Sequence, residues 1–190
     1  VEPYIVNEPH GYSSNKNWEL IEKKSNKLEF KINYPENDLV ENLIRTIEVQ
    51  DDEPNKIFCT LQIHVKEDCE LPIGLHPMFR IPKKMSKIKI NAGNFKFGLN
   101  YPGLVLKDKT LGAIGREFSS LDKVEGFDGN TIDLSQPPFD GNFEYLFQLC
   151  GIDGNMSLEN FEENYKFNFS WNPNHFTSVL MWVSNKGRTE

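Results

Sequence analysis

Residues 28–33 read LEFKIN, in which Leu28, Phe30 and Ile32 alternate with charged or amide side chains. Successive side chains of an extended strand point to opposite faces, so this spacing puts the three apolar residues on one face. An apolar residue at every second position predicts a strand with one buried and one exposed face.

The same alternation predicts further strands along the chain. Apolar and polar residues alternate at residues 57–65, 143–149 and 165–171. The continuous apolar run at 179–183 is typical of a strand buried on both faces. We expect this run and residues 165–171 to be central strands of a packed sandwich.

Turn chemistry predicts some of the connections. An Asp-Gly-Asn triplet at residues 153–155 tolerates positive φ and separates residues 143–149 from residues 156–161, which predicts a hairpin. Similar turn signals at residues 122–142 predict loops and short strands. No segment sustains helical spacing, with residues 38–44 as a weak exception.

These patterns together predict an all-β fold, an antiparallel β-sandwich that covers residues 1–190 as a single domain. A chain of 190 residues is long enough to bury one core of this kind. No linker or change of composition divides it.

Composition excludes several classes of partner. The net charge of −7 disfavours a nucleic-acid partner, because phosphate binding needs clustered Lys and Arg side chains. The three cysteines have unrelated spacings, which indicates neither a disulfide framework nor a metal motif. We therefore expect a reducing, cytoplasmic location, with secretion left open. No apolar stretch approaches the length of a membrane span, so no membrane partner is expected.

Of the four histidines, His76 stands out because the Gly-Leu-His-Pro sequence at 74–77 predicts a turn that fixes an imidazole. The alternative is a structural histidine satisfied by backbone hydrogen bonds, and the residues alone favour that interpretation. His10 lies in a second turn flanked by Pro and Gly. His64 and His175 have no partner at metal-ligand spacing, and we expect them at the surface.

Three segments carry a more specific signal. They are PHGY at residues 9–12 followed by Trp18, LPIGLHPMFRIP at residues 71–82, and VLMWVSNKGR at residues 179–188. In this order they resemble the aldose 1-epimerase (galactose mutarotase-like) family. The middle segment is the most specific, since a Gly-x-His-Pro-x-Phe core after a strand is a hallmark of that family.

The resemblance implies a galactose mutarotase-like supersandwich that binds an aldohexose on its concave face. It implies an isomerase that interconverts the α and β anomers by acid–base ring opening and closure, without a cofactor or metal. By motif match, His76 is the acid at the ring oxygen, a role that suits a histidine because imidazole side chains give and take protons near neutral pH. His10 matches the family histidine that hydrogen-bonds the ring oxygen or neighbouring hydroxyls and helps to place the sugar. Arg80 is a candidate contact for an anion or hydroxyls, with an exposed strand-edge arginine as the alternative.

The chain departs from the family pattern in two places. Related sugar-phosphate mutarotases carry an Arg shortly after the His-Gly pair, where this chain has Ser13 and Ser14, so we expect a neutral sugar. The family's general base is a Glu on a strand beyond the third segment, and Glu190 lies too close to that segment to match it. We therefore expect the base to lie outside residues 1–190 and the sandwich to be incomplete at both ends.

Two other functions remain as alternatives. The first is a carbohydrate-binding β-sandwich without catalysis, favoured by the absent base. The second is a β-sandwich interaction module whose histidines are structural. The sequence leaves open which sugar is bound and the oligomeric state.

Overall fold

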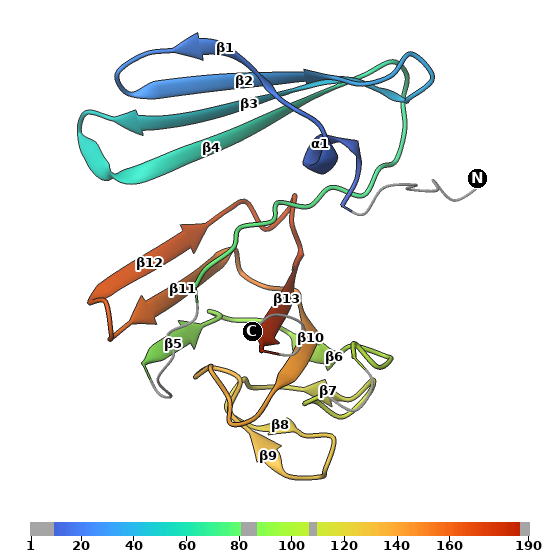
Figure 1. Ribbon diagram of the computed structural model, residues 1–190, viewed down its shortest axis with the longest axis vertical. Coiled ribbons are helices and arrows are strands. Elements are labelled where there is room, and N and C mark those ends of the chain that lie inside the picture. Colours follow the sequence, from blue (N-terminus) through green and yellow to red (C-terminus); the bar gives the residue numbers. More distant parts are fainter. Residues whose placement is uncertain (1–9, 81–86, 107–109, 187–190) are drawn as a thin grey trace. The chain divides into compact units, whose positions relative to one another are not determined.

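The computed structural model describes residues 10–80, 87–106 and 110–186 (Figure 1). Within these ranges lie thirteen strands and one short helix, and every pairing between the strands is antiparallel. The prediction of an all-β, antiparallel protein is confirmed. No helix in the same ranges is long and apolar enough to cross a bilayer.

Backbone contacts divide the chain into two compact units, Val1–His76 and Pro77–Glu190. Each unit has its own sheets and its own buried cluster of apolar side chains. A single domain over residues 1–190 stays a prediction.

One four-stranded sheet makes up most of the first unit. After the helix α1 (Tyr12–Asn15), its strands follow chain order as β1 (Glu19–Lys23), β2 (Lys27–Asn33), β3 (Val40–Gln50) and β4 (Glu53–Val65) (Figure 1). The strands predicted at residues 28–33 and 57–65 are confirmed. The weak helical spacing at 38–44 gives no helix, because Val40 begins a strand that pairs with both β2 and β4.

The apolar face of this sheet is buried mainly around one group of residues. Ile32 faces Leu43 in the register of β2 and β3, and both are buried together with Val40. Six partly buried side chains pack around these three, namely Tyr12, Trp18, Tyr34, Leu61, Ile63 and Leu71. Since some of them lie outside the strands, this cluster attaches the flanking segments to the sheet.

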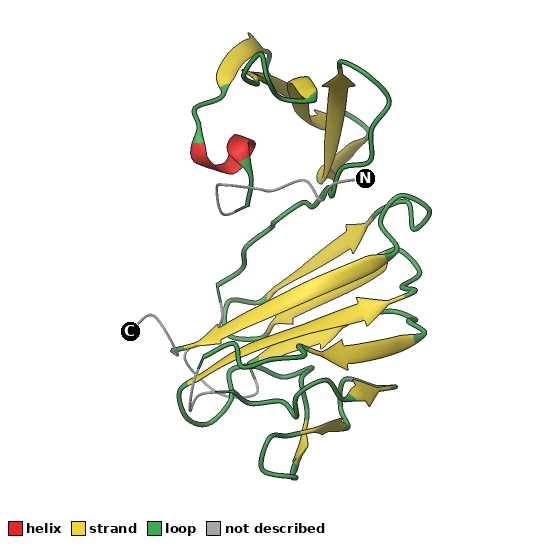
Figure 2. Ribbon diagram, turned by 90° about the vertical axis from the view of Figure 1, so that its right-hand side faces the viewer, coloured by secondary structure: helices red, strands yellow, loops and turns green. Residues whose placement is uncertain are grey.

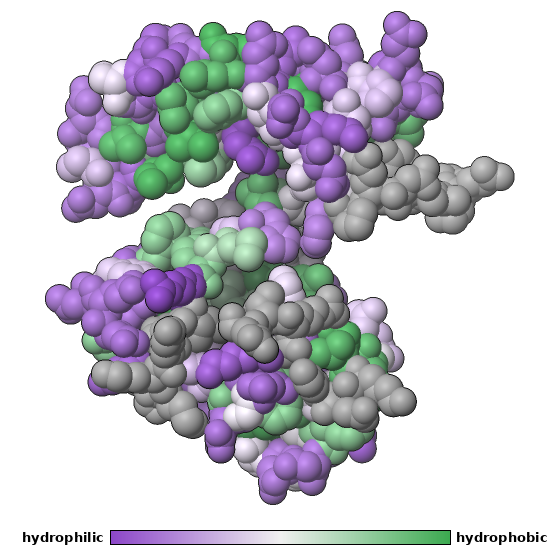
Figure 3. Space-filling view, viewed as in Figure 1, coloured by the Kyte–Doolittle hydropathy of each residue, from purple (hydrophilic) through white to green (hydrophobic). Residues whose placement is uncertain are grey.

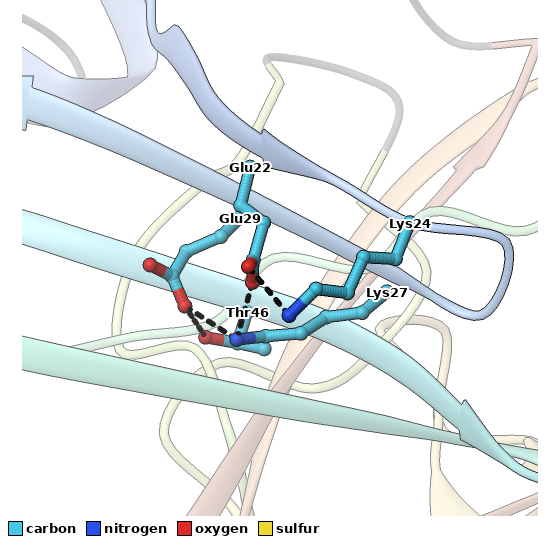
Figure 4. Close-up of polar contacts among 5 residues, drawn as sticks. All are labelled: Glu22, Lys24, Lys27, Glu29 and Thr46. Carbon is cyan, nitrogen blue, oxygen red and sulfur yellow. Dashed lines mark hydrogen bonds and ion pairs between the residues drawn. The ribbon is translucent and has the colours of Figure 1, made fainter.

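The polar side chains that alternate with this apolar face form a series of ion pairs (Figure 4). The Lys24 and Lys27 ammonium groups lie 2.6 and 2.8 Å from the Glu22 carboxylate, and Lys27 also lies 3.0 Å from Glu29. The Thr46 hydroxyl donates a hydrogen bond to Glu29 at 3.1 Å. Hydrogen bonds from Lys24 and then Lys27 lower the pKa of Glu22 from 4.5 to about 2. Because all of these groups are partly exposed, the ion pairs contribute little to the stability of the fold, and their main effect is on the pKa of Glu22.

The second unit contains two larger sheets and one small one among its described residues. The first of the larger sheets has the order β13 (Ser178–Asn185), β10 (Phe143–Cys150), β6 (Phe97–Asn100) and β7 (Glu117–Phe118) (Figures 1 and 2). The second has the order β12 (Tyr165–Ser170), β11 (Asn155–Asn160) and β5 (Ile88–Asn91). The small sheet pairs β8 (Val124–Glu125) with β9 (Thr131–Ile132). The short strands predicted within residues 122–142 are confirmed.

The two larger sheets share one core, as expected of a sandwich. Tyr145, Phe147 and Leu149 of β10 join Ile90 of β5 and the neighbouring Ala92 in a single buried cluster. These three β10 residues alternate along the strand and are at most 2% exposed, which the pattern at residues 143–149 predicted. Burial raises the pKa of the Tyr145 hydroxyl, which donates a hydrogen bond to the buried side chain of Asn100.

The predicted hairpin across residues 143–161 is wrong. β10 pairs with β6 and β13, whereas β11 pairs with β5 and β12. The turn at residues 153–155, where Gly154 has a φ of 84°, therefore carries the chain from one sheet to the other. Its glycine supplies the positive φ of this turn, but the turn residues do not decide which strand the chain joins next.

The prediction that residues 165–171 and 179–183 form central strands is also wrong. β12 and β13 each lie at the end of their sheet in the described chain. Along β13, Leu180 and Trp182 are 64% and 47% exposed, whereas Val183 is 5% exposed. The continuous apolar run thus covers one buried face and one open face, which side-chain type alone does not distinguish.

Apolar side chains are also visible on the surface of the first unit, among many polar ones (Figure 3).

We expect the Glu22 carboxyl to titrate near pH 2, and the substitution Lys27→Met to move its midpoint upward towards 4.5, because one of its two lysine partners is lost. The folded-state pKa lies below the unfolded value, so the ion pairs stabilise the fold above pH 4.5 and this contribution disappears as the pH falls towards 2. A carbon-detected NMR titration of the side-chain carboxyl measures both chains. A midpoint near 4.5 in the unaltered chain contradicts the network.

Gly98→Ala should destabilise the second unit, because a Cβ at this position of β6 would overlap the ring of Phe118 in the core. Overpacking of this kind costs about 1–3 kcal/mol of the free energy of unfolding. Gly74→Ala is the matched control, since its Cβ would meet no atom within 4 Å, and we expect a change within about 0.5 kcal/mol. Urea unfolding measures both, and equal effects would argue against the packing at Gly98.

Candidate functional site

The two histidines singled out from the sequence lie next to each other in the first unit. The ring centroids of His10 and His76 are 5.1 Å apart, and the ring planes meet at 80°. Both side chains are exposed to solvent. The fold thus brings together two imidazoles from distant parts of the chain, one before α1 and one after β4.

His10 is held by the turn that leads into α1. Its φ of 62° is followed by a φ of 78° at Gly11, so two successive residues adopt positive φ. The Gly11 carbonyl accepts hydrogen bonds from the backbone N–H of Ser14 at 3.3 Å and from the Asn15 amide at 2.8 Å. The left-handed conformation costs a non-glycine residue about 1–2 kcal/mol, so the chain keeps an imidazole here at the expense of stability.

Side chains following His10 attach this turn to the sheet. Tyr12 packs against Tyr34, with ring centroids 4.7 Å apart. The Trp18 indole N–H donates a hydrogen bond to the Ser13 carbonyl at 2.9 Å, which ties the two ends of the α1 segment together. Because Tyr12 and Trp18 both pack on the buried cluster, the position of His10 follows from the packing of the sheet.

His76 lies in an irregular segment. Residues 68–80 form no helix, strand or turn, and Gly74 does not have positive φ. The predicted turn at residues 74–77 is therefore wrong, because Pro77 favours an extended residue before it as readily as a turn. Leu71 packs on the same cluster as Tyr12 and Trp18. One apolar cluster therefore anchors the segments on either side of the histidine pair.

Arg80 belongs to the second unit and is exposed. Its neighbour Phe79 packs against the rings of Phe167 and Phe169 on β12, at centroid distances of 5.2 and 4.9 Å. These aromatic contacts fix the start of the second unit on its own sheet. A role for Arg80 in substrate binding stays a prediction.

The histidine pair offers acid–base chemistry without a third partner in the described part of the chain. Each neutral imidazole has one donor and one acceptor nitrogen. Two adjacent rings can therefore hydrogen-bond neighbouring oxygens of a bound molecule and exchange protons with them. No third His, Cys, Asp or Glu among the described residues groups with the pair to form a cluster of metal-ligand type. His64 on β4 and His175 are exposed, as predicted.

The third sequence segment holds a buried polar network in the second unit. Glu144 of β10 is fully buried and accepts hydrogen bonds from the Trp182 indole N–H at 2.5 Å and the Ser184 hydroxyl at 2.8 Å. The Asn185 side chain connects β13 to the segment that precedes β10. It accepts a hydrogen bond from the Phe139 N–H and donates hydrogen bonds to the carbonyls of Phe139 and Gly141. Trp182, Ser184 and Asn185 thus have structural partners, and residues 187 and 188 lie outside the described ranges.

A shallow hollow on the first unit's sheet was not predicted from the sequence. It has a volume of about 230 Å³ and is lined by Trp18, Phe30, Arg45 and Ile47. The Arg45 guanidinium lies 4.6 Å from the Trp18 ring centre, a cation–π distance. The sequence feature that could have indicated this hollow is Arg45, a charged residue at a position of β3 where the alternation predicts an apolar one. The hollow offers one cation and no acid–base group, so the histidine pair remains the better candidate for chemistry.

Comparisons with models of protein families, with curated proteins and with solved structures found no match. The functional assignment therefore depends on the sequence motifs and on the geometry of the site. The strongest geometric fact is the contact between His10 and His76.

Asn185→Ala should destabilise the second unit by about 2–3 kcal/mol, because it removes three hydrogen bonds and leaves backbone groups of Phe139 and Gly141 without their partner. Asn142→Ala removes an exposed side chain of the same type nearby in the sequence, and we expect a change within about 0.5 kcal/mol. Denaturant unfolding measures both variants. If Asn185→Ala costs no more than its control, the network is not stabilising.

Proposed function

We propose that this chain is part of an aldose 1-epimerase-like isomerase that interconverts the α and β anomers of a hexose. The observation that carries the proposal is the pair of His10 and His76, which the sequence motifs assign to one site and which lie 5.1 Å apart. The antiparallel sheets agree with the fold that such an enzyme requires. The positive φ of His10 adds support, because strained residues concentrate at functional sites.

Mutarotation requires one proton delivered to the ring oxygen and one removed from the anomeric hydroxyl. In the proposed reaction, the protonated His76 imidazole donates to the ring oxygen while a base takes the hydroxyl proton, and the bond between the anomeric carbon and the ring oxygen breaks. The open aldehyde rotates about its bond to the sugar chain and the ring closes with the proton transfers reversed. His10 hydrogen-bonds the ring oxygen or an adjacent hydroxyl and so orients the sugar for the transfer.

The base is proposed to lie outside residues 1–190, as the family pattern implies. A neutral aldohexose is the proposed substrate, because Ser13 and Ser14 stand where a guanidinium would bind a phosphate. Arg80 is proposed to contact sugar hydroxyls. The cytoplasm is the proposed location, where aldohexoses are consumed and thiols such as Cys59 and Cys69 remain reduced.

A second candidate is a carbohydrate-binding β-sandwich without catalysis. It is favoured by the absence, among the described residues, of an acidic side chain grouped with the two histidines. In this alternative the imidazoles serve as hydrogen-bonding groups for sugar hydroxyls. Sugar binding by the complete polypeptide without any acceleration of anomer exchange selects this alternative.

His76→Ala should lower the rate of anomer exchange by at least about 100-fold, because a positioned acid contributes a factor of this size or more. His10→Ala should lower the rate as well, mainly through loss of sugar orientation. His64→Ala is the matched control, since His64 is exposed on β4, and it should leave the rate unchanged. Polarimetry of freshly dissolved α-D-galactose and α-D-glucose, with the complete polypeptide, measures all three. Exchange no faster than in buffer, with no effect of His76→Ala, would overturn the proposal.

A further inference from the structure

The separation of the two imidazoles matches the geometry of two ligands on one metal ion. A zinc ion lies about 2.0–2.1 Å from a ligating imidazole nitrogen, which places it about 3.2 Å from the ring centroid. Two imidazoles at a tetrahedral angle on one zinc therefore have centroids about 5.2 Å apart. The observed separation between His10 and His76 is 5.1 Å.

This match does not depend on how each ring is turned. The centroid of an imidazole lies close to the line of the Cβ–Cγ bond, so rotation about χ2 exchanges the positions of the nitrogens while the centroid hardly moves. The χ2 angle of histidine has a broad distribution, which lets both rings turn a nitrogen towards a common point. The positions of the two rings thus already satisfy the distance requirement for chelation.

The surroundings of the pair indicate which metals would bind and how many protein ligands they would have. Imidazole is a ligand of Zn²⁺, Cu²⁺ and Ni²⁺, whereas Mg²⁺ and Ca²⁺ prefer oxygen. Since no third side-chain ligand groups with the pair among the described residues, the other positions on the metal stay open to water or to another oxygen ligand. Both rings are exposed, so an ion reaches them from solvent.

We propose that His10 and His76 chelate a divalent transition-metal ion such as Zn²⁺ through one nitrogen of each imidazole. Each ligand is the neutral imidazole, and binding forms two zinc–nitrogen bonds as two waters leave the ion. The two segments are fixed by Tyr12, Trp18 and Leu71 on one apolar cluster, so the metal meets a pair that is already assembled. This metal site stands on the geometry of the pair and does not depend on the proposed catalysis.

One consequence rests on the proposed function. A zinc ion bound to both imidazoles occupies the nitrogens that would give a proton to the ring oxygen and orient the sugar. Zinc should therefore inhibit anomer exchange reversibly, with activity restored by EDTA. Undiminished exchange at a zinc concentration that saturates the histidines would contradict the catalytic roles of His10 and His76, while leaving the metal site itself in place.

The direct test is a titration of the nitrogen-15-labelled chain with zinc chloride, without sugar, read from the histidine ring nitrogens by NMR. We expect the ring signals of His10 and His76 to shift together and saturate at one zinc per chain, while those of His64 and His175 do not move. Magnesium chloride at the same concentration should move none of them. Zinc-dependent shifts at only one of the two rings, or at neither, would overturn the proposal.

Variants separate loss of a ligand from loss of the fold. His10→Gly suits the positive φ of this position, so it removes the ligand together with the backbone strain and should not lower the thermal midpoint. His10→Gly and His76→Ala should each weaken zinc binding by more than about tenfold, since mutating a residue that only hydrogen-bonds a metal ligand already lowers metal affinity by that factor. His64→Ala and His175→Ala should not change it. Unchanged affinity in a folded His10→Gly or His76→Ala chain would refute bidentate chelation.

Discussion

The cluster formed by Ile32, Val40 and Leu43 is the constraint on which the candidate site depends. These side chains are buried where β2 and β3 pair, and segments before and after the sheet pack on them. Tyr12 and Trp18 attach the turn that carries His10, and Leu71 attaches the irregular segment that carries His76. Because neither histidine lies in a strand, the position of each follows from these apolar contacts, and burial of this kind contributes about 25 cal/mol per Å² of apolar surface.

The two units achieve order in different ways. In its described residues the first unit has a single sheet with an apolar face that is only partly buried and a polar face of ion pairs, so its packing is concentrated around a few side chains. In the second unit the two larger sheets share a core of aromatic and aliphatic residues, with buried polar side chains paired to specific partners. Glu144 and Asn185 illustrate this pairing, since each has hydrogen-bonding partners that offset the cost of its burial.

Much of the fold was predictable from local patterns. Residues 28–33 and 143–149 alternate and both are strands; Tyr145, Phe147 and Leu149 form the expected buried face, whereas Ile32 is the only buried residue of its strand. The connections were less predictable, because the Asp-Gly-Asn turn at 153–155 permits a reversal without choosing a partner strand. The edge position of β13 was also hidden, since Leu180 and Trp182 are apolar and yet exposed.

The site was predictable in part. The Gly-x-His-Pro-x-Phe and His-Gly motifs pointed to His76 and His10, but the turn expected around His76 is absent and the positive φ of His10 has no signal beyond the following Gly11. Arg45 was visible as a charge at an apolar position of β3, although its contact with Trp18 requires a tertiary structure. The partners of Glu144 could not be inferred, because they come from the register of β10 with β13.

If His10 and His76 form one site, a nuclear Overhauser spectrum should connect their ring protons. We expect a cross-peak between the two imidazoles, whose centroids lie 5.1 Å apart, and the Tyr12–Tyr34 pair at 4.7 Å provides an internal positive control. A spectrum that shows the tyrosine cross-peak but none between the histidines would mean that the two imidazoles do not form one site.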